Sequence, residues 1–256
     1  MLTLSFIIEL TRRDFAERFA GSSLGSFWAF IWPLVNLFIY IIIFGRLMGA
    51  RLPGADSVYA YSVYLASGLI AWTAFSQTVA RCSNIFTEKK HLISKVNLSL
   101  PSLLLFVISA ETVTYLISMV IFFLFLILTG YPLTRHLLLL PFIYLLQAIF
   151  AFGLGLLTAT LSVFIRDLKE VVGITLQLWF WFTPIVYVRE ILPVWVQKLL
   201  LINPAFIFIE SYQRIFVFND SPALHSLLVM VVAVHLLVWG AYALFRKLEK
   251  DVRDFL

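Results

Sequence analysis

Charged residues are scarce in this 256-residue chain, and their scarcity indicates the class of protein. Asp, Glu, Lys and Arg make up 13% of the residues, whereas soluble domains carry about 25%. Hydrophobic residues make up 62%, and the mean hydropathy is +0.98. These values exclude a soluble globular domain and predict an integral membrane protein.

Motifs for metal binding, phosphate binding and catalysis are also missing. The single cysteine, Cys82, cannot form an internal disulfide, and no pair of residues has metal-ligand spacing. The segment between Gly21 and Gly25 is too short for a phosphate-binding loop and lacks its lysine. No Ser–His–Asp order, paired carboxylates or histidine cluster indicates catalysis. We therefore expect no catalytic residue, no metal site and no cofactor bound by this chain.

Six stretches with little or no charge predict six membrane-spanning helices in an all-α fold. They cover about residues 27–48, 57–80, 102–128, 138–164, 171–188 and 221–245. Between the last two, residues 190–219 are apolar but interrupted by Pro193 and by Asn203 with Pro204, which leaves pieces too short to cross. This segment predicts a re-entrant helical pair. Residues 25–248 then form a transmembrane domain, and residues 249–256 form a cytoplasmic tail.

The positions of Lys and Arg predict the orientation. With the N-terminus inside, thirteen of these residues lie in inner segments and six in outer segments. The positive-inside rule then places both termini in the cytoplasm. The net charge of +5 therefore reflects the inner face of a membrane protein, and we expect no nucleic-acid partner.

Residues 1–24 predict a cytoplasmic amphipathic helix in the plane of the membrane interface. Its apolar side contains Leu4, Ile8, Phe15 and Phe19. Its opposite side contains Glu9, Arg13 and Glu17. Such a helix either anchors the chain before the first span or presents its polar side to a cytoplasmic partner.

Glu111 is the one acidic residue inside a predicted span, where an ionisable side chain is costly. One interpretation is a structural glutamate bonded to Ser or Thr of a neighbouring helix. The other is a proton site or a substrate contact. The spans offer no second charge as a partner for a proton relay, which favours the structural interpretation.

Two stripes of aromatic and amide side chains follow the predicted helices. Residues four apart on the first span form one stripe, made of Trp28, Trp32, Asn36 and Tyr40. The fifth span has a second stripe, made of Gln177, Trp181 and Pro184. Because lipid offers no hydrogen bond to an amide, both stripes should face protein or a water-filled cavity. They either line a pathway or bond between helices in a closed bundle.

Two further sets of charged residues lie outside the spans. The loop 81–99 carries Glu88, Lys89 and Lys90, and is either a solvated loop or a short helix that contacts a partner. Near the outer boundary, Glu210 and Arg214 have the spacing of an ion pair on one helix turn.

Three sequence blocks give the chain a family likeness. The first runs from Ser23 to Trp28 (SLGSFW) and continues with Trp32-Pro33-Leu34. The second contains Phe164-Ile-Arg-Asp-Leu168, Gln177 and the run FWFTPIVY that ends at Tyr187. The third is Asn203-Pro204 with Glu210 and Arg214 behind it. Taken together and in this order, the blocks resemble the membrane subunit of a type-2 ABC exporter, in the branch that exports polysaccharides. Arg18-Phe19-Ala20 departs from the basic residue and Tyr that usually precede the first block.

The resemblance implies a homodimer of this chain in the bacterial inner membrane, with two copies of a separate ATP-binding subunit that holds ATP and Mg. It implies a coupling helix at about residues 85–95, with Glu88, Lys89 and Lys90 as ATPase coupling residues. It also implies a periplasmic gate at Glu210 and Arg214. The implied substrate pathway contains Trp28, Trp32, Asn36, Tyr40, Gln177, Trp181 and Tyr187.

The implied substrate is a lipid-linked glycan, most like O-antigen on undecaprenyl diphosphate, which would place the chain in lipopolysaccharide biosynthesis. Alternatives within the fold are export of capsule, teichoic acid, a drug or a small lipid. A proton-coupled secondary carrier using Glu111 is a different class, disfavoured by the absence of an inverted repeat. A membrane-embedded transferase would need an acid–base pair near one interface, and none is visible in the sequence.

Overall fold

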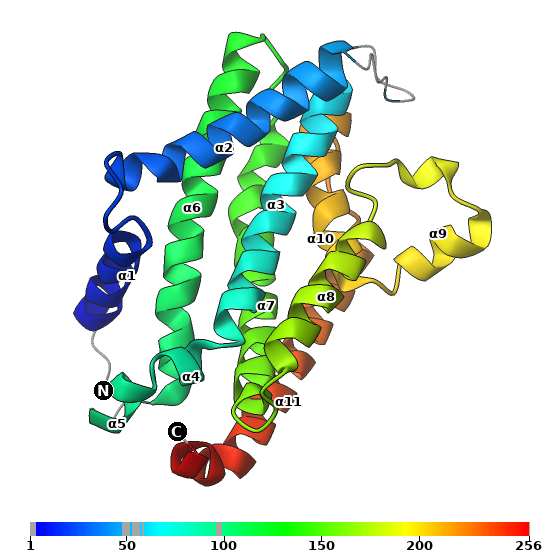
Figure 1. Ribbon diagram of the computed structural model, residues 1–256. Helices are drawn as coiled ribbons and strands as arrows, with labels where there is room; N and C mark the ends of the chain where they lie inside the picture. Colours follow the sequence, from blue (N-terminus) through cyan, green and yellow to red (C-terminus); the bar gives the residue numbers. More distant parts are fainter. Residues whose placement is uncertain (1–3, 48–51, 53–56, 58, 96–98, 256) are drawn as a thin grey trace.

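The computed structural model describes residues 4–47, 52, 57, 59–95 and 99–255, and these residues form helices with no strand among them (Figure 1). The α-helices are α1 (Leu4–Arg18), α2 (Trp28–Ile39), α3 (Ala60–Cys82), α4 (Ile85–Glu88), α5 (Lys90–Lys95), α6 (Leu100–Leu128), α7 (Leu140–Ser162), α8 (Leu168–Trp181), α9 (Val194–Leu200), α10 (Pro204–Gln213) and α11 (Leu224–Phe255). Short 3-10 helices are η1 (Gly25–Phe27), η3 (Arg135–Leu139) and η4 (Arg189–Ile191). Two π-helices are η2 (Tyr40–Leu47) and η5 (Arg214–Phe218).

Helix α7 occupies the centre of the bundle, because it packs against both α3 and α11. Helix α6 packs beside α3 and α7, and α10 packs against α3. Helix α2 crosses α6 obliquely, and its π-helical continuation η2 reaches α3 (Figure 1). Helix α1 lies along α6, toward the end of the molecule where α4, α5 and the C-terminus also lie (Figure 1).

Two glycines of α7 allow its close packing with neighbouring helices. A Cβ atom on Gly155 would lie 2.6 Å from Cβ of Cys82 at the end of α3. A Cβ atom on Gly153 would lie 3.0 Å from Cγ of Leu237 on α11. Small residues at helix contacts are typical of membrane bundles, where packing replaces the hydrophobic driving force between helices.

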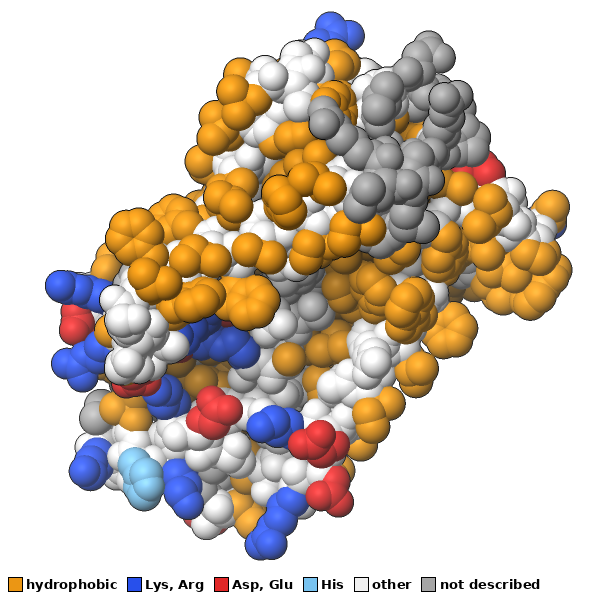
Figure 2. Space-filling view, turned by 45° about the horizontal axis from the view of Figure 1, so that its top comes forward, with side chains coloured by type: hydrophobic (Ala, Val, Ile, Leu, Met, Phe, Trp, Pro, Cys, Tyr) orange, Lys and Arg blue, Asp and Glu red, His pale blue; other side chains and the backbone are white. Residues whose placement is uncertain are grey.

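The outer surface of the bundle is strongly apolar. Large hydrophobic side chains project outward from the long helices, with exposed fractions such as 67% for Val120, 76% for Leu128 and 73% for Trp239. In Figure 2, hydrophobic side chains cover much of the visible face, and charged side chains gather toward one end. An apolar exterior with the charged side chains gathered toward the ends is the pattern that a bilayer requires.

Within the described residues, three helical segments are long and apolar enough to cross a membrane: Leu100–Leu128, Arg135–Ser162 and Leu224–Phe255. The segment Val194–Leu200 with Pro204–Phe218 is bent by 97°, which fits either a broken span or a re-entrant loop. The remaining predicted spans coincide with the shorter helices α2 and α8 and with the more polar α3. Residues 48–51, at the predicted end of the first span, lie outside the described residues.

The fifth predicted span differs from the structure in its length. We predicted a helix over 171–188, whereas α8 begins at Leu168 and ends at Trp181. Pro184 explains the early end, because proline cannot donate the backbone hydrogen bond of a helix and pushes the preceding residue toward an extended conformation. The predicted stripe of Gln177, Trp181 and Pro184 therefore does not continue to Pro184, which lies buried beyond the helix.

Candidate functional site

The first predicted stripe lines a cavity of about 220 Å³ between α1, α2, α3 and α6. Trp28, Trp32, Asn36 and Tyr40 all border it, as their four-residue spacing predicts. The Asn36 side-chain amide donates to the carbonyl of Trp32 at 2.9 Å, and the Trp28 indole donates to the Ser22 hydroxyl at 2.9 Å. Trp32 is 62% exposed, so its ring forms an accessible wall rather than part of the packed core.

The opposite walls of the cavity come from α3 and α6. Leu69 and Ile70 contribute apolar surface from α3, and Tyr115 contributes a ring from α6. At the end nearest α1, the lining changes to the charged residues Arg18 and Glu111. The cavity thus joins an aromatic wall to a cluster of buried charges.

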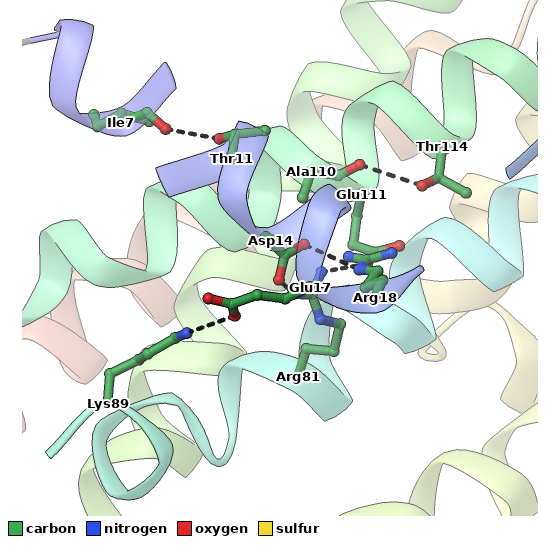
Figure 3. A network of polar contacts seen from close by, with 10 residues as sticks. All are labelled: Ile7, Thr11, Asp14, Glu17, Arg18, Arg81, Lys89, Ala110, Glu111 and Thr114. Carbon is green, nitrogen blue, oxygen red and sulfur yellow. Dashed lines mark hydrogen bonds and ion pairs between the residues drawn. The ribbon is translucent and has the colours of Figure 1, made fainter. Parts of the chain in front are cut away.

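This cluster, hereafter the ion network, consists of Asp14 and Arg18 on α1, Arg81 on α3 and Glu111 on α6 (Figure 3). Oε1 of Glu111 accepts from Nη2 of Arg18 and from Nη1 of Arg81, each at 2.6 Å. Asp14 pairs with Nε of Arg18 at 2.9 Å and also with Nη2 of Arg81. Each arginine therefore bridges both carboxylates, and the four side chains join three helices.

The ion network is largely removed from solvent. The Glu111 side chain is 5% exposed and that of Asp14 is 12% exposed, while both arginines are about one-quarter exposed (27% for Arg18 and 25% for Arg81). Burial raises the pKa of Asp14 above its ordinary value, and the positive charge of Arg18 opposes this rise. The two arginines balance the two carboxylates, so that the network carries no net formal charge.

Glu111 has two charged partners, although the predicted spans offered none. Its partners come from outside the predicted span interiors: Arg81 lies in the last turn of α3, and Arg18 lies at the end of α1. Two guanidinium groups hold Glu111 at 2.6 Å, so its partners are not of the predicted Ser or Thr type.

The second predicted stripe does not border the cavity lined by the first stripe. Gln177 is exposed and borders a separate hollow with Trp72, Gln77 and Phe180. Trp181 is 58% exposed, and its carbonyl accepts from the Tyr187 hydroxyl at 2.7 Å. Within one copy of the chain, the two stripes therefore do not border the same cavity.

The predicted coupling segment folds into the two short helices α4 and α5. Lys89, between them, forms an ion pair with Glu17 of α1 at 3.4 Å (Figure 3). Glu88 borders a hollow of about 580 Å³ together with Arg166, Lys169 and Phe255, and Lys90 is exposed. Three segments far apart in the sequence thus meet at this end of the molecule.

At the other end, Glu210 and Arg214 have different partners from those expected. Glu210 pairs with Arg189 at 3.3 Å, and Arg214 pairs with Asp220. The expected direct pair is wrong although the backbone between the two residues is α-helical, with the N–H of Arg214 bonded to the carbonyl of Glu210. Arg189 takes Glu210, and the chain turns at the left-handed Asn219 after the π-helix, where Asp220 takes Arg214. All four residues border a hollow of about 350 Å³ with Tyr64 and Gln213.

No group of His, Cys, Asp and Glu among the described residues could hold a metal ion.

The sequence profile described as ABC-2 type transporter matches residues 6–217. The chain belongs to this family. An O-antigen export system permease protein from Myxococcus xanthus is 26% identical over 250 residues, covering 97% of this chain and 94% of that protein. One from Klebsiella pneumoniae is 26% identical over 251 residues, covering 98% and 94%.

An ABC-2 membrane protein is a transport subunit rather than a catalytic one, and the family implies an ATP-binding partner. The geometry is consistent with this class of transporter. An accessible aromatic cavity lies on one side of the ion network, and the α4–α5 segment lies on the other.

Sequence reasoning missed Arg18 and Arg81 as partners of Glu111, and Asp14 as the second carboxylate that both arginines bridge. Arg81 and Glu111 lie 30 residues apart, and Arg18 and Glu111 lie 93 apart, so no local spacing connects them. One available signal was Asp14, which follows Ile7 and Leu10 at the seven- and four-residue spacings of one apolar helix face. A charge on that side needs a buried partner.

Proposed function

We propose that this chain is the permease subunit of an ATP-driven exporter of a lipid-linked polysaccharide, of the O-antigen type on undecaprenyl diphosphate. The observation that carries the proposal is the similarity to O-antigen export permeases along nearly the whole chain. Two copies of the chain would form the pathway, and two copies of an ATP-binding subunit, with ATP and Mg, would drive it. Cargo would move from the cytoplasm to the periplasm.

The proposed topology has six spans with both termini in the cytoplasm. Two arguments support it: the excess of Lys and Arg in the inner segments, and the shared end of α1, α4, α5 and the C-terminus (Figure 1). In this topology the α4–α5 segment, with Glu88, Lys89 and Lys90, contacts the ATP-binding subunit. The hollow around Glu210 and Arg214 then faces the periplasm as a gate.

The aromatic wall suits a glycan. The apolar C–H faces of sugar rings stack on aromatic faces, and neighbouring amides supply hydrogen bonds. Trp32 and Trp28 lie with ring centroids 6.4 Å apart, and Asn36 follows on the next turn. Such a surface holds a sugar polymer through many weak contacts, so that it can slide. Gln177, Trp181 and Tyr187 would extend the pathway across the dimer.

Deletion and complementation in the source bacterium test this proposal. Loss of the gene should abolish surface polysaccharide, and lipid-linked glycan should accumulate on the inner side of the membrane. The wild-type gene should restore export, whereas Trp32→Ala should lower it by about tenfold, a loss of about 1.4 kcal/mol. Trp239→Ala is the matched control, because Trp239 is an exposed tryptophan on the outer surface of α11 and should leave export intact.

The outcomes distinguish the possible substrates. Loss of capsule or teichoic acid with O-antigen retained would reassign the substrate within the same fold. Unchanged surface glycans together with altered drug or lipid efflux would refute the polysaccharide assignment. Equal effects of Trp32→Ala and Trp239→Ala would show that the α2 stripe faces lipid rather than cargo.

A further inference from the structure

The ion network connects the α4–α5 segment to the wall of the cavity through α1. Arg81 lies in the last turn of α3, and α4 begins four residues later at Ile85. Glu111 lies on α6, the helix that follows the α4–α5 segment. Both helices that flank this segment therefore hold α1 through charged side chains. Lys89 within the segment forms a further ion pair with Glu17 of α1.

The connection continues from α1 into the cavity. Phe15 and Phe19 border the cavity beside Arg18. The short turn after α1 leads directly into η1 and α2, which carries the aromatic stripe. Any displacement of α1 relative to α3 and α6 would therefore move one wall of the cavity.

The bonding pattern makes this connection rigid. Each guanidinium group uses two different nitrogens to reach two carboxylates, which gives four ion pairs among four side chains. Planar guanidinium groups with two fixed acceptors hold direction as well as distance. Apolar packing alone would hold α1 less strictly, because Phe6, Ile7 and Leu10 are only partly buried against the cluster beneath them.

We propose that Asp14, Arg18, Arg81 and Glu111 are positioning residues that lock α1 to α3 and α6, so that movement of the α4–α5 segment by the ATP-binding subunit is transmitted to the aromatic wall of the cavity. The network acts through geometry and does not contact the ATP. This inference extends the proposed function, since it gives a route from ATP hydrolysis to the pathway.

A charge-balanced double variant separates transmission from folding. Glu111→Met alone leaves buried arginines without their shared acceptor and should lower the amount of assembled complex. Arg81→Met with Glu111→Met removes one charge of each sign and leaves the Asp14–Arg18 pair intact on α1. Replacing a buried pair by apolar residues of similar volume is often tolerated, so the double variant should assemble with the ATP-binding subunit.

The decisive measurement is export per ATP hydrolysed in the assembled transporter. We expect the double variant to assemble yet to lose about tenfold in this ratio, within the usual range of coupling between sites. The matched control is Glu9→Gln with Arg13→Gln, which removes an exposed pair of the same type on α1 and should leave the ratio unchanged. If the assembled double variant retains the wild-type ratio of export to ATP hydrolysed, the network is structural only and the inference is overturned.

Hydrogen exchange of the α1 amides in the purified complex supplies a readout that does not depend on the cargo. In the double variant, the α1 amides should exchange faster than in the control variant, because the Arg18–Glu111 and Asp14–Arg81 ion pairs are lost. Equal protection in the two variants would overturn the inference even if export fell. Failure of the proposed function would be visible separately, as unchanged surface glycan after deletion of the wild-type gene.

Discussion

Asn203 holds together the bend between α9 and α10 and the end of α8. Its Oδ1 atom accepts from two backbone N–H groups at the start of α10, at 3.0 and 3.4 Å. The same oxygen accepts from the Trp179 indole of α8 at 2.7 Å, and the Asn203 amide donates to the Thr183 hydroxyl at 3.1 Å. One side chain thus caps a helix and ties it to the chain that follows α8.

Replacing Asn203 by alanine should remove all of these bonds. The lost helix cap costs about 1 kcal/mol, and the indole and hydroxyl bonds cost about 1 kcal/mol each. The expected destabilisation is therefore about 3 kcal/mol for Asn203→Ala. Asn203→Asp keeps the accepting oxygen and loses only what the amide nitrogen donates, to the Thr183 hydroxyl and, at 3.4 Å, to the Phe182 carbonyl, so its cost should be about 1 kcal/mol.

Thermal unfolding of the purified transporter, followed by tryptophan fluorescence, measures this series. At about 2–4 °C per kcal/mol for a chain of this size, the alanine variant should unfold about 6–12 °C lower and the aspartate variant about 2–4 °C lower. Asn84→Ala is the control, because Asn84 precedes α4 without a side-chain cap bond and should change the midpoint little. Equal midpoints for Asn203→Ala and Asn203→Asp would refute the role of the accepting oxygen.

Two further predictions concern packing and topology. Gly155→Val should destabilise the protein by about 1–3 kcal/mol, because its Cβ would overlap that of Cys82. Gly173→Ala meets open space inside α8 and should not lower stability in the same unfolding assay, since alanine favours a helix more than glycine does. A cysteine at position 90, introduced in place of Lys90 in a Cys82→Ala background, should react with a membrane-impermeant thiol reagent only after the cells are opened. Reaction in intact cells would contradict the proposed orientation.

The helices were largely predictable because the hydropathy pattern is long-ranged and strong. Each of the six predicted spans overlaps a helix, and the interrupted segment 190–219 contains the predicted break at Asn203–Pro204. The four-residue spacing from Trp28 also correctly predicted one shared stripe. These features depend on residues close together in the sequence, where helix geometry alone decides which side chains are neighbours.

The errors arose where the backbone departs from a regular α-helix or where contacts are distant. Glu210 and Arg214 have the spacing of an ion pair, but each has another partner from a more distant part of the chain or from beyond the π-helix, Arg189 and Asp220 respectively. Pro184 ends α8 before the predicted boundary. The partners of Glu111 depend on how α1 docks on α6, and no periodicity in the sequence contains that information.

The positions of the buried charges explain why the protein tolerates their cost. Most contacts among α3, α6, α7 and α11 are apolar, and apolar attraction lacks the directional preference of a hydrogen-bonded ion pair. The ion network lies instead where α1 meets α3 and α6, and the Arg189–Glu210 pair lies where the segment after α8 meets α10. Desolvating charges makes such a junction expensive to form, but it also makes every misaligned arrangement worse, since a displaced partner leaves a buried charge unpaired. Ion pairs between helices therefore fix their relative placement more strictly than apolar packing does. A transporter needs this property where one helix must transmit the movement of another.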